Sequence, residues 1–402
     1  MRNTSSEIFA PKKICVFTST RADYGLWHHT LRALLKAPDF ELAVLVTGTH
    51  LSREHGRTVE EIRSDGIPIA KEVDMLLSSD NQLAIAKSMG LALMGYAEAL
   101  TDLAPDVLLV LGDRYETLCA ATAATICGIP IAHCHGGEKS EGAFDEAFRH
   151  AVTKMSHLHF VATEKYRERV VQLGEQPSRV VVTGALGLEN ITNGEFLTKA
   201  ELEENLKIGL GSRYFVITFH PVTLEQETSV AQFQELLNAL SKYFPDFKAV
   251  FTLPNADTES GKIADLIKAY CGRNSNAFWF PSLGWKRYLS AAKHSHGVIG
   301  NSSSGIIEAP SLGVGTVNIG DRQKGRDAGM SVLHCSPEEK CIANAITRLL
   351  APEFRSRLAN FTNPYHGPEK PSSLILKTLR IFTPKSLKKT FYDLPRKLAI
   401  DV

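Results

Sequence analysis

The sequence has almost no net charge, no apolar run long enough to cross a membrane and no regular spacing of cysteines. Its 45 Lys and Arg residues against 44 Asp and Glu leave a formal charge of +1, which excludes a protein that coats nucleic acid or an acidic membrane by bulk charge. The longest uncharged run, residues 117–132, is interrupted by Gly128 and Pro130 and is too short for a membrane span. We therefore expect this run to lie in a buried core.

Two further absences bear on compartment and cofactors. The seven cysteines are an odd number without a CxxC pair, and the first residues lack the apolar stretch of a secretory signal, so a reduced, cytoplasmic protein is predicted. The glycine run at 313–318, GVGTVN, lacks the third glycine of a dinucleotide loop and leads into a strand. The Gly261-Lys262 pair lacks the upstream glycine of a Walker loop. Neither a nicotinamide cofactor nor ATP hydrolysis is predicted.

Short β-branched runs alternate with longer helix-period segments along most of the chain, a pattern typical of α/β proteins with parallel sheets. Strands are predicted at 14–18, 42–47, 68–73, 107–111, 129–133, 158–162 and 180–182, and in the second half at 215–219, 249–253, 277–280, 297–299 and 315–319. Helices are predicted at 24–36, 81–103, 116–127, 165–173, 225–243 and 371–383. The pattern therefore indicates two doubly wound halves.

The chain length suits two or three domains, and a composition shift indicates where they meet. Residues 183–198 are rich in Gly and Asn and poor in strand formers, as expected for a crossover between domains. We predict a first domain at 1–185 and a second at 186–369.

The strongest local signal is residues 300–305, GNSSSG, between an apolar run and a short helix expected near residue 306. A strand, turn and helix junction of this kind presents backbone N–H groups and hydroxyls, which suits a pyrophosphate; an ordinary serine helix cap is the alternative. Glu308 is placed to accept from ribose hydroxyls, and Arg322 follows the next strand and can face the same phosphates. A nucleotide-phosphate site is therefore predicted here.

The densest polar cluster covers residues 133–138, HCHGGE, followed by DEAFRH at 145–150. Gly-Gly after a strand allows a tight turn with the backbone close to a ligand. The two histidines of the first run would point the same way in a strand, but no third ligand follows at a suitable spacing, so a metal is not predicted. Asp145 and Arg149 lie at i and i+4, so a plain ion pair on the helix surface is the alternative to a role in a site.

Other polar loops follow strands in both halves. The tripeptide Gly-Asp-Arg occurs at 112–114 and again at 320–322, each time after an apolar strand. In open parallel sheets the loops at the carboxyl ends of strands line the ligand crevice, so both tripeptides are placed at a site between the domains, unless the repeat is a coincidence. The loop at 19–25, STRADYG, also joins a strand to a helix, and His220 ends an apolar strand, where a core or capping histidine is the alternative.

Several motifs in a fixed order connect the chain with a known family. In chain order they are TRADYG at 20–25, LGDRYE at 111–116, HCHGGE at 133–138, Arg149-His150 with Lys154-Met155, FHP at 219–221, NAD at 255–257, GNSSSG at 300–305 and IGDRQ at 319–323. Together they resemble the hydrolysing UDP-N-acetylglucosamine 2-epimerases of sialic-acid biosynthesis. The resemblance spans nearly the whole chain.

The resemblance implies a GT-B-like fold, with two Rossmann-like doubly wound domains, a central cleft and the C-terminal helix, about 370–402, packing back on the first domain. It implies anti elimination of UDP to 2-acetamidoglucal and then hydration to N-acetylmannosamine, without a metal or a nicotinamide. The implied ligands are a UDP-linked sugar and the UDP product, and the implied assembly is a homo-oligomer, a dimer or tetramer.

This chemistry needs a base for the C2 proton and cations for the departing phosphate. The residues that fit acid, base or sugar contacts are Asp113, Asp145, Glu146, His220, His135 and Glu138. Those that fit the phosphates of the nucleotide are Arg21, Arg114, Ser302, Ser303 and Arg322. Glu308 fits the ribose, and Asn255 fits a role in framing the nucleotide. Many non-hydrolysing relatives carry Glu at the position of His135, whereas the bacterial hydrolysing branch, like this chain, carries His there. The role of His135 or Glu138 in reprotonating the glucal therefore stays open.

Three alternatives share most of these motifs. A hydrolysing 2-epimerase of UDP- or GDP-2,4-diacetamido-2,4,6-trideoxyglucose, in legionaminic acid biosynthesis, would differ in what contacts C4 and C6 of the sugar. A GT-B glycosyltransferase would need an acceptor and would leave the C2 hydrogen in place. A non-catalytic nucleotide-sugar module would have little use for Asp113, Asp145 and Glu146 beside a charged diphosphate.

Overall fold

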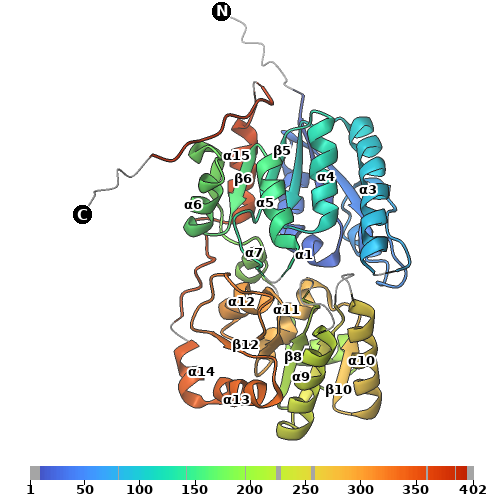
Figure 1. Ribbon diagram of the computed structural model, residues 1–402, viewed down its shortest axis with the longest axis vertical. Helices are drawn as coiled ribbons and strands as arrows, with labels where there is room; N and C mark the ends of the chain where they lie inside the picture. The colour runs from blue at the N-terminus through green and yellow to red at the C-terminus, as the bar shows by residue number, and fades with distance from the viewer. Residues whose placement is uncertain are drawn as a thin grey trace, which may run out of the picture.

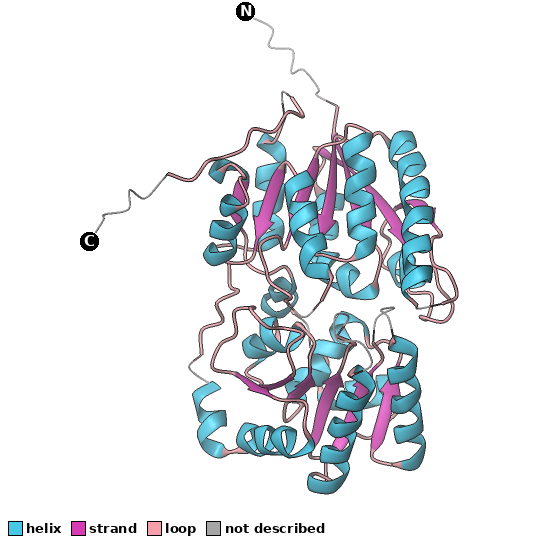
Figure 2. Cartoon of the chain, viewed as in Figure 1, coloured by secondary structure: helices cyan, strands magenta, loops and turns pink. Residues whose placement is uncertain are grey.

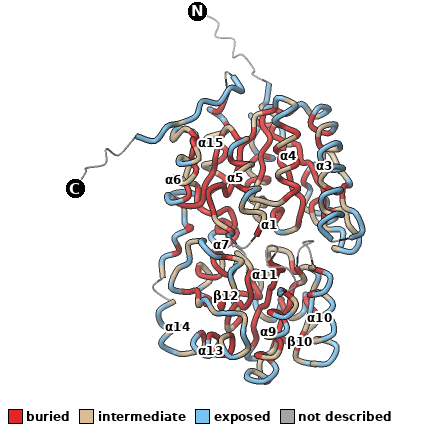
Figure 3. Tube along the Cα trace, viewed as in Figure 1, coloured by how far each residue is buried: buried red, intermediate tan, exposed pale blue. Residues whose placement is uncertain are grey.

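The chain forms two α/β halves, one above the other in the view of Figure 1. The computed structural model describes residues 10–79, 81–141, 143–194, 196–222, 228–254, 259–358, 361–384 and 386–395. Each half has a parallel sheet with helices on both faces (Figure 2), and buried residues concentrate along the two sheets (Figure 3). The predicted α/β class with two doubly wound halves is confirmed.

The first half is built on a seven-stranded sheet in the order β3-β2-β1-β4-β5-β6-β7. Its strands are β1 (Lys12–Thr18), β2 (Phe40–Thr47), β3 (Ile69–Val73), β4 (Val107–Leu111), β5 (Ile131–Cys134), β6 (Leu158–Val161) and β7 (Val180–Val182). Its helices are α1 (Arg21–Lys36), α2 (Val59–Ser64), α3 (Gln82–Leu103), α4 (Tyr115–Ile126), α5 (Asp145–Met155), α6 (Glu164–Gln172) and α7 (Gly187–Thr192). β1 and β4 are continuous apolar runs because a central parallel strand is covered on both faces.

The second half repeats the same relative order, β10-β9-β8-β11-β12-β13. Its strands are β8 (Tyr214–Thr218), β9 (Lys248–Thr252), β10 (Ala277–Phe280), β11 (Val298–Gly300), β12 (Thr316–Ile319) and β13 (Val332–Cys335). Its helices are α8 (Lys199–Leu206), α9 (Ser229–Tyr243), α10 (Ser260–Arg273), α11 (Gly284–His294), α12 (Ser304–Ile307), α13 (Glu339–Leu350) and α14 (Pro352–Leu358). Sequence analysis missed β13, a short edge strand whose outward side chains include His334, so its pattern carries little strand signal.

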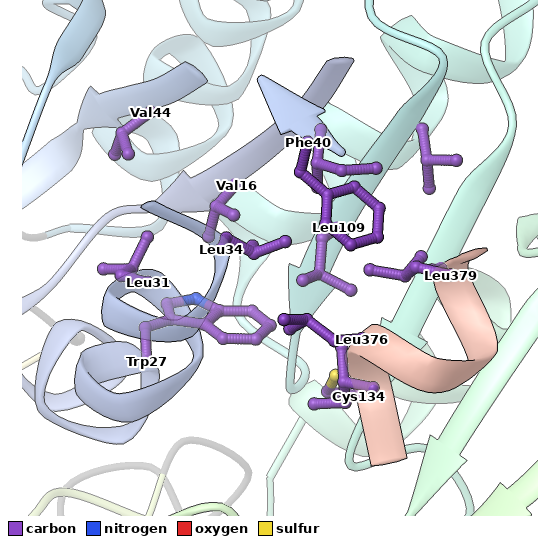
Figure 4. Packing of buried hydrophobic residues seen from close by; sticks show 14 of the residues in the cluster. Val16, Trp27, Leu31, Leu34, Phe40, Val44, Leu109, Cys134, Leu376 and Leu379 are labelled. Atoms are coloured by element: carbon purple, nitrogen blue, oxygen red, sulfur yellow. The ribbon is translucent and has the colours of Figure 1, made fainter. Parts of the chain in front are cut away.

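The last helix, α15 (Pro371–Ile381), returns to the first half and packs against α1. In Figure 4, Leu376 and Leu379 of α15 lie beside Trp27 of α1 and Leu109 of β4, and all four are buried in one cluster. The helix therefore completes the core under β4. The domain boundaries at 185/186 and 369/370 stay a prediction.

Helix α3 is the one helix of the described residues that is long and apolar enough to cross a membrane by length and composition. A core helix passes the same test, and only 33% of its most apolar window is buried. It packs against α4 and β3, and its Ala92 and Tyr96 are fully buried. This packing accounts for part of its apolar character.

Candidate active site

A cavity of about 310 Å³ lies where the carboxyl ends of the two sheets meet. Parallel doubly wound sheets place ligands in this region, outside the strand ends. We call its lining from the first half the first wall, which includes Arg21, Asp113, Arg114, His135, Glu138, Asp145 and Arg149. We call its lining from the second half the second wall, which includes His220, Ser302, Ser303, Ser304, Glu308, Arg322, Gln323 and Arg326.

The cavity brings together most of the residues that the sequence singled out. Eleven of the thirteen expected site residues line it: Asp113, Asp145, His220, His135, Glu138, Arg21, Arg114, Ser302, Ser303, Glu308 and Arg322. Glu146 does not line it, and Asn255 lies outside the described residues. Arg149, Gln323 and Arg326 line it although sequence analysis gave them no role.

The second wall begins at the end of β11, where Gly300 has φ of +133° and a Cβ would lie 1.9 Å from the Thr218 carbonyl oxygen. Only glycine fits this position. The next residue, Asn301, is fully buried, and its side chain accepts from the His220 backbone N–H at 2.7 Å and donates to the His220 carbonyl at 2.8 Å. The turn therefore fixes the backbone of His220 at the cavity.

The serines of this turn lead directly into α12, which begins at Ser304 rather than near residue 306. Because α12 is a single turn of four residues, its macrodipole is small, and the hydroxyls of Ser302 and Ser303 remain the donors that the segment offers. Arg322 and Gln323 both donate to the Asn301 carbonyl, at 3.1 and 2.9 Å. The Arg322 guanidinium thus lies against the serine turn, and the shared phosphate site stays a prediction.

Glu308 lines the same wall after α12. Burial raises the pKa of its carboxyl, while a hydrogen bond from the Ser304 side chain acts in the opposite direction. A Cβ at Gly187 would lie 2.3 Å from the Glu308 Oε1, so the glycine leaves room for this carboxylate between the two halves.

On the first wall, the loop before α1 is folded around Asp23. The Asp23 carboxylate accepts from the backbone N–H groups of Ser19 at 2.8 Å and Thr20 at 2.9 Å, completing a capping box at the start of α1. This arrangement presents Arg21 at the cavity, where it donates to the Leu253 carbonyl of the second half at 3.2 Å. Burial lowers the pKa of Arg21 to about 10, so the guanidinium stays charged at neutral pH.

Arg114 is held by a carboxylate that sequence analysis did not single out. Its Nε and Nη2 donate to the two oxygens of Glu116, at 3.1 and 3.2 Å, and Glu116 is fully buried. A two-bond pair of this kind fixes the plane of the guanidinium. Arg114 therefore reaches the cavity with its orientation set.

Asp113 follows Gly112, whose φ of +76° turns the chain at the end of β4. The Gly112 carbonyl accepts from His133 Nε2 at 2.8 Å, and burial lowers the pKa of His133 to about 3, so its ring is neutral. His133 thus holds the turn. Among the described residues there is no group of three or more His, Cys, Asp or Glu side chains placed to hold a metal ion.

Arg149 pairs with Asp113, whereas the sequence suggested a helix-surface pair with Asp145. Its guanidinium is buried, and besides Asp113 it donates to the Ser140 hydroxyl at 2.8 Å and the His135 carbonyl at 3.2 Å. The Asp113 side chain keeps 22% of its surface exposed at the cavity. Arg149 therefore sets the position of this carboxylate from behind.

Both ring nitrogens of His135 are engaged. The Leu186 N–H donates to Nε2 at 3.2 Å, so the ring proton is on Nδ1, 2.6 Å from the Glu138 carboxylate. Burial by itself would raise the pKa of Glu138, but the contacts with Arg326, His135 and Arg149 outweigh burial and hold that pKa far below its usual range. These contacts favour a holding role for the pair over direct acid or base catalysis.

Glu146 is not among the residues that line the cavity. It accepts from the Ser140 N–H at 2.5 Å and from His150 Nε2 at 3.1 Å. Burial opposes its ionisation, but these hydrogen bonds prevail and lower its pKa. Of the acidic residues expected to act as acid or base, Asp113, Asp145 and Glu138 line the cavity, whereas Glu146 does not.

Known proteins are similar to this chain in sequence and in fold. A family model described as UDP-N-acetylglucosamine 2-epimerase matches residues 32–380. The chain is 40% identical to the polysialic acid biosynthesis protein P7 of Escherichia coli, over 96% of this chain and 98% of that protein. It is 38% identical to the GDP/UDP-N,N'-diacetylbacillosamine 2-epimerase (hydrolyzing) of Campylobacter jejuni, over 95% and 99%.

A solved structure extends the match to three dimensions. The crystal structure of the UDP-GlcNAc 2-epimerase of Neisseria meningitidis bound to UDP-GlcNAc superposes with a TM-score of 0.76 at 22% identity, covering 92% of this chain and 99% of that one. The fold is therefore the GT-B-like fold of these enzymes, as the sequence predicted. The chain belongs to the UDP-N-acetylglucosamine 2-epimerase family.

Proposed function

We propose that the protein is a hydrolysing 2-epimerase that converts UDP-N-acetylglucosamine to N-acetylmannosamine and UDP, for sialic acid biosynthesis. The observation that carries the proposal is the pairing of carboxylates with cations and hydroxyls around one cavity: Asp113 and Asp145 stand near Arg21 and Arg114 on one wall, opposite the serine turn and Arg322 on the other. A nucleotide diphosphate needs the cations, and removal of a sugar proton needs a carboxylate.

In the first proposed step, a base removes the C2 proton while the bond between C1 and the UDP oxygen breaks on the opposite face, giving 2-acetamidoglucal and UDP. In the second, water adds its oxygen to C1, and a proton returns to C2 on the other face. Asp113 and Asp145 are the carboxylates at the cavity, and His220 reaches it from the second wall. We assign the acid and base roles to this group, with Glu146 acting at most through Ser140 and His150.

The phosphates are proposed to lie between the guanidinium groups and the serine turn. Arg21, Arg114 and Arg322 supply positive charge. Ser302 and Ser303 supply hydroxyl donors, and Glu308 lies at the same wall for the ribose. This distribution would stabilise the charge that develops on UDP as it departs. The framing role expected for Asn255 stays a prediction.

A diacetamido sugar is the second candidate substrate, and a specific observation favours keeping it. The chain is 38% identical to the Campylobacter enzyme, named for a GDP- or UDP-linked diacetylbacillosamine, and 40% identical to a protein named for polysialic acid biosynthesis. In contrast, the Neisseria structure is bound to UDP-GlcNAc. The elimination and hydration are the same for either sugar, and the two substrates differ at C4 and C6.

The test is incubation of the chelated protein with UDP-N-acetylglucosamine in D₂O, followed by proton NMR. UDP with N-acetylmannosamine deuterated at C2 supports the proposal, including its independence of metal and nicotinamide. UDP- and GDP-linked 2,4-diacetamido-2,4,6-trideoxyglucose, tested in parallel, identify the preferred sugar and nucleotide. Absence of UDP or GDP release from all three would contradict the proposal and favour a glycosyltransferase or a binding module.

We further propose that the enzyme is a cytoplasmic homo-oligomer. All seven cysteines are unpaired, which suits a reducing compartment. Leu83 and Met94 lie about three turns apart on one face of α3 and are 65% and 62% exposed, and apolar side chains gathered on one face often mark a subunit contact. Light scattering should give the mass of a dimer or tetramer, and Leu83→Glu with Met94→Glu should lower it.

A further inference from the structure

One ion pair crosses the cavity from the second wall to the first. Arg326 follows β12, and its Nη2 lies 2.8 Å from Oε2 of Glu138, which follows β5. The two side chains are only 6% and 2% exposed. A buried pair of this kind needs both partners, because removing one leaves an uncompensated charge in the interior.

Glu138 connects this ion pair to Asp113, the carboxylate at the cavity. Its other oxygen lies 2.6 Å from His135 Nδ1, and Oε2 is also 3.8 Å from Nη1 of Arg149. Arg149 in turn donates to Asp113 and to the His135 carbonyl. A continuous chain of charged contacts therefore runs from the loop of the second sheet to Asp113.

The loop that carries Arg326 is fastened to the first half on both sides of the pair. The Asp327 N–H donates to the Tyr166 hydroxyl at 3.1 Å, and the Asp327 carbonyl accepts from the Tyr365 hydroxyl at 2.9 Å. Gly325 packs so closely on Lys139 that a Cβ would lie 2.8 Å from its side chain. Arg326 thus enters the cavity wall at a fixed point.

The same short loop also holds the second wall together. Arg322 and Gln323 both donate to the Asn301 carbonyl, and the Asn301 side chain binds the His220 backbone. Residues 322–326 therefore contact the group that positions His220 at one end and the group that positions Asp113 at the other.

We propose that Arg326 is a positioning residue: by pairing with Glu138 across the cavity, it fixes Arg149 against Asp113 and so sets the first wall relative to the second. This inference rests on the proposed function and adds to it a residue outside the acid, base and phosphate groups. It also gives a role to Glu138, whose buried carboxylate is the ion-pair partner of Arg326 rather than a proton donor.

The test compares five variants for melting temperature, UDP affinity by calorimetry, and kcat and KM for UDP release. Arg326→Met is expected to lower kcat about 100-fold, the size of effect that a small misplacement of a reacting group produces. UDP affinity should stay near that of the wild type, because Arg326 is not among the groups proposed for the phosphates. Arg326→Lys, which keeps the charge, should recover a large part of the lost kcat.

Glu138→Gln and the double variant Arg326→Met with Glu138→Gln separate positioning from stability. The double variant removes both charges, so its melting temperature should recover relative to either single variant, while its kcat should stay low. The matched control is Lys165→Met, which breaks the exposed pair of Lys165 with Asp327 on the same loop and should leave kcat unchanged.

Two results would overturn the role of Arg326 alone: wild-type kcat in folded Arg326→Met, or recovery of both kcat and melting temperature in the double variant. Either would show a pair that serves stability only. A wild-type protein that releases no nucleotide from any of the three sugars would instead overturn the proposed function, and the role of Arg326 with it.

Discussion

The two Gly-Asp-Arg tripeptides share sequence and backbone but not surroundings. Gly112 and Gly320 have φ of +76° and +71°, and each turns the chain after a buried strand. Asp113 then lies at the cavity against the buried Arg149, whereas Asp321 is 61% exposed and pairs with Lys324 at 3.3 Å. The local motif therefore sets the turn, and the packed neighbours decide whether its carboxylate lies at the cavity.

The largest expected difference between the tripeptides is in turnover. Asp113→Asn should lower kcat about 100- to 10,000-fold, the range that a positioned acid or base contributes. Asp321→Asn is the matched control, because the same change is made in the same turn on an exposed side chain, and kcat should stay at the wild-type value. UDP release would be measured at saturating substrate, with UDP affinity as a check on folding. Equal losses of kcat in both variants would contradict a role for Asp113 that Asp321 lacks.

This contrast also marks how far the sequence could predict the site. Strand ends, turns and the residues directly after them are local features, so Asp113, Ser302 and Arg322 were predicted at one crevice and lie there. The partner of Asp113 was not predicted, since Arg149 is 36 residues away and its i, i+4 neighbour Asp145 offered a simpler pair.

The same reason explains what else was missed. Asn301 was seen only as part of a polar turn, but its side chain binds His220, 81 residues earlier in the chain. Arg326 carried no motif, and its contact with Glu138 exists only because two sheets meet. The fold followed from hydrophobic periodicity, which repeats within each half, whereas the contacts between the halves depend on packing that no short pattern encodes.

The second prediction tests the core packing that supports the Gly-Asp-Arg tripeptide at 112–114. Leu109 of β4, three residues before Gly112, packs in the cluster that α15 completes with Leu376. Leu376→Ala should lower the free energy of unfolding by about 2–5 kcal/mol, as is usual for a buried leucine. Ile381→Ala, on the same helix but 84% exposed, should change it by no more than about 0.5 kcal/mol. Denaturant melts measure both, and a similar loss in the two variants would argue against this role of α15.

The third prediction tests Asn301, the uncharged side chain that holds the His220 backbone at the second wall. Asn301→Ala leaves the buried N–H and carbonyl of His220 without their partner, which should cost about 1–3 kcal/mol of stability. Asn301→Asp keeps the acceptor for the N–H, but its second carboxylate oxygen cannot donate to the His220 carbonyl and would place a charge at a fully buried position, so this variant should not recover the lost stability. Thermal melts and UDP affinity would be compared, and a fully stable Asn301→Ala protein would contradict the assignment.

The smallest expected effect concerns the bond that closes each turn. The Gly112 carbonyl accepts from His133, whereas the Gly320 carbonyl accepts from the Asn318 amide at 3.3 Å, which does not titrate. Burial lowers the pKa of His133 to about 3, while an unfolded histidine has a pKa of about 6.5. Between these values the unfolded chain binds a proton that the folded protein does not.

The stability linked to His133 is therefore complete above pH 6.5 and is lost as the pH falls below it, by about 1.4 kcal/mol at pH 5.5. His133→Gln keeps an amide donor and makes the first turn chemically similar to the second. Its free energy of unfolding should fall by about 1.4 kcal/mol less than that of the wild type between pH 7.5 and 5.5. At pH 5.5, amide hydrogen exchange should be slower in His133→Gln than in the wild type in the first half and unchanged in the second. The reason is that the Asn318 amide, which donates to the Gly320 carbonyl, does not gain a proton. If the free energy of unfolding of His133→Gln depends on pH as it does in the wild type, protonation of the His133 ring is not the cause of the difference between the two turns at low pH.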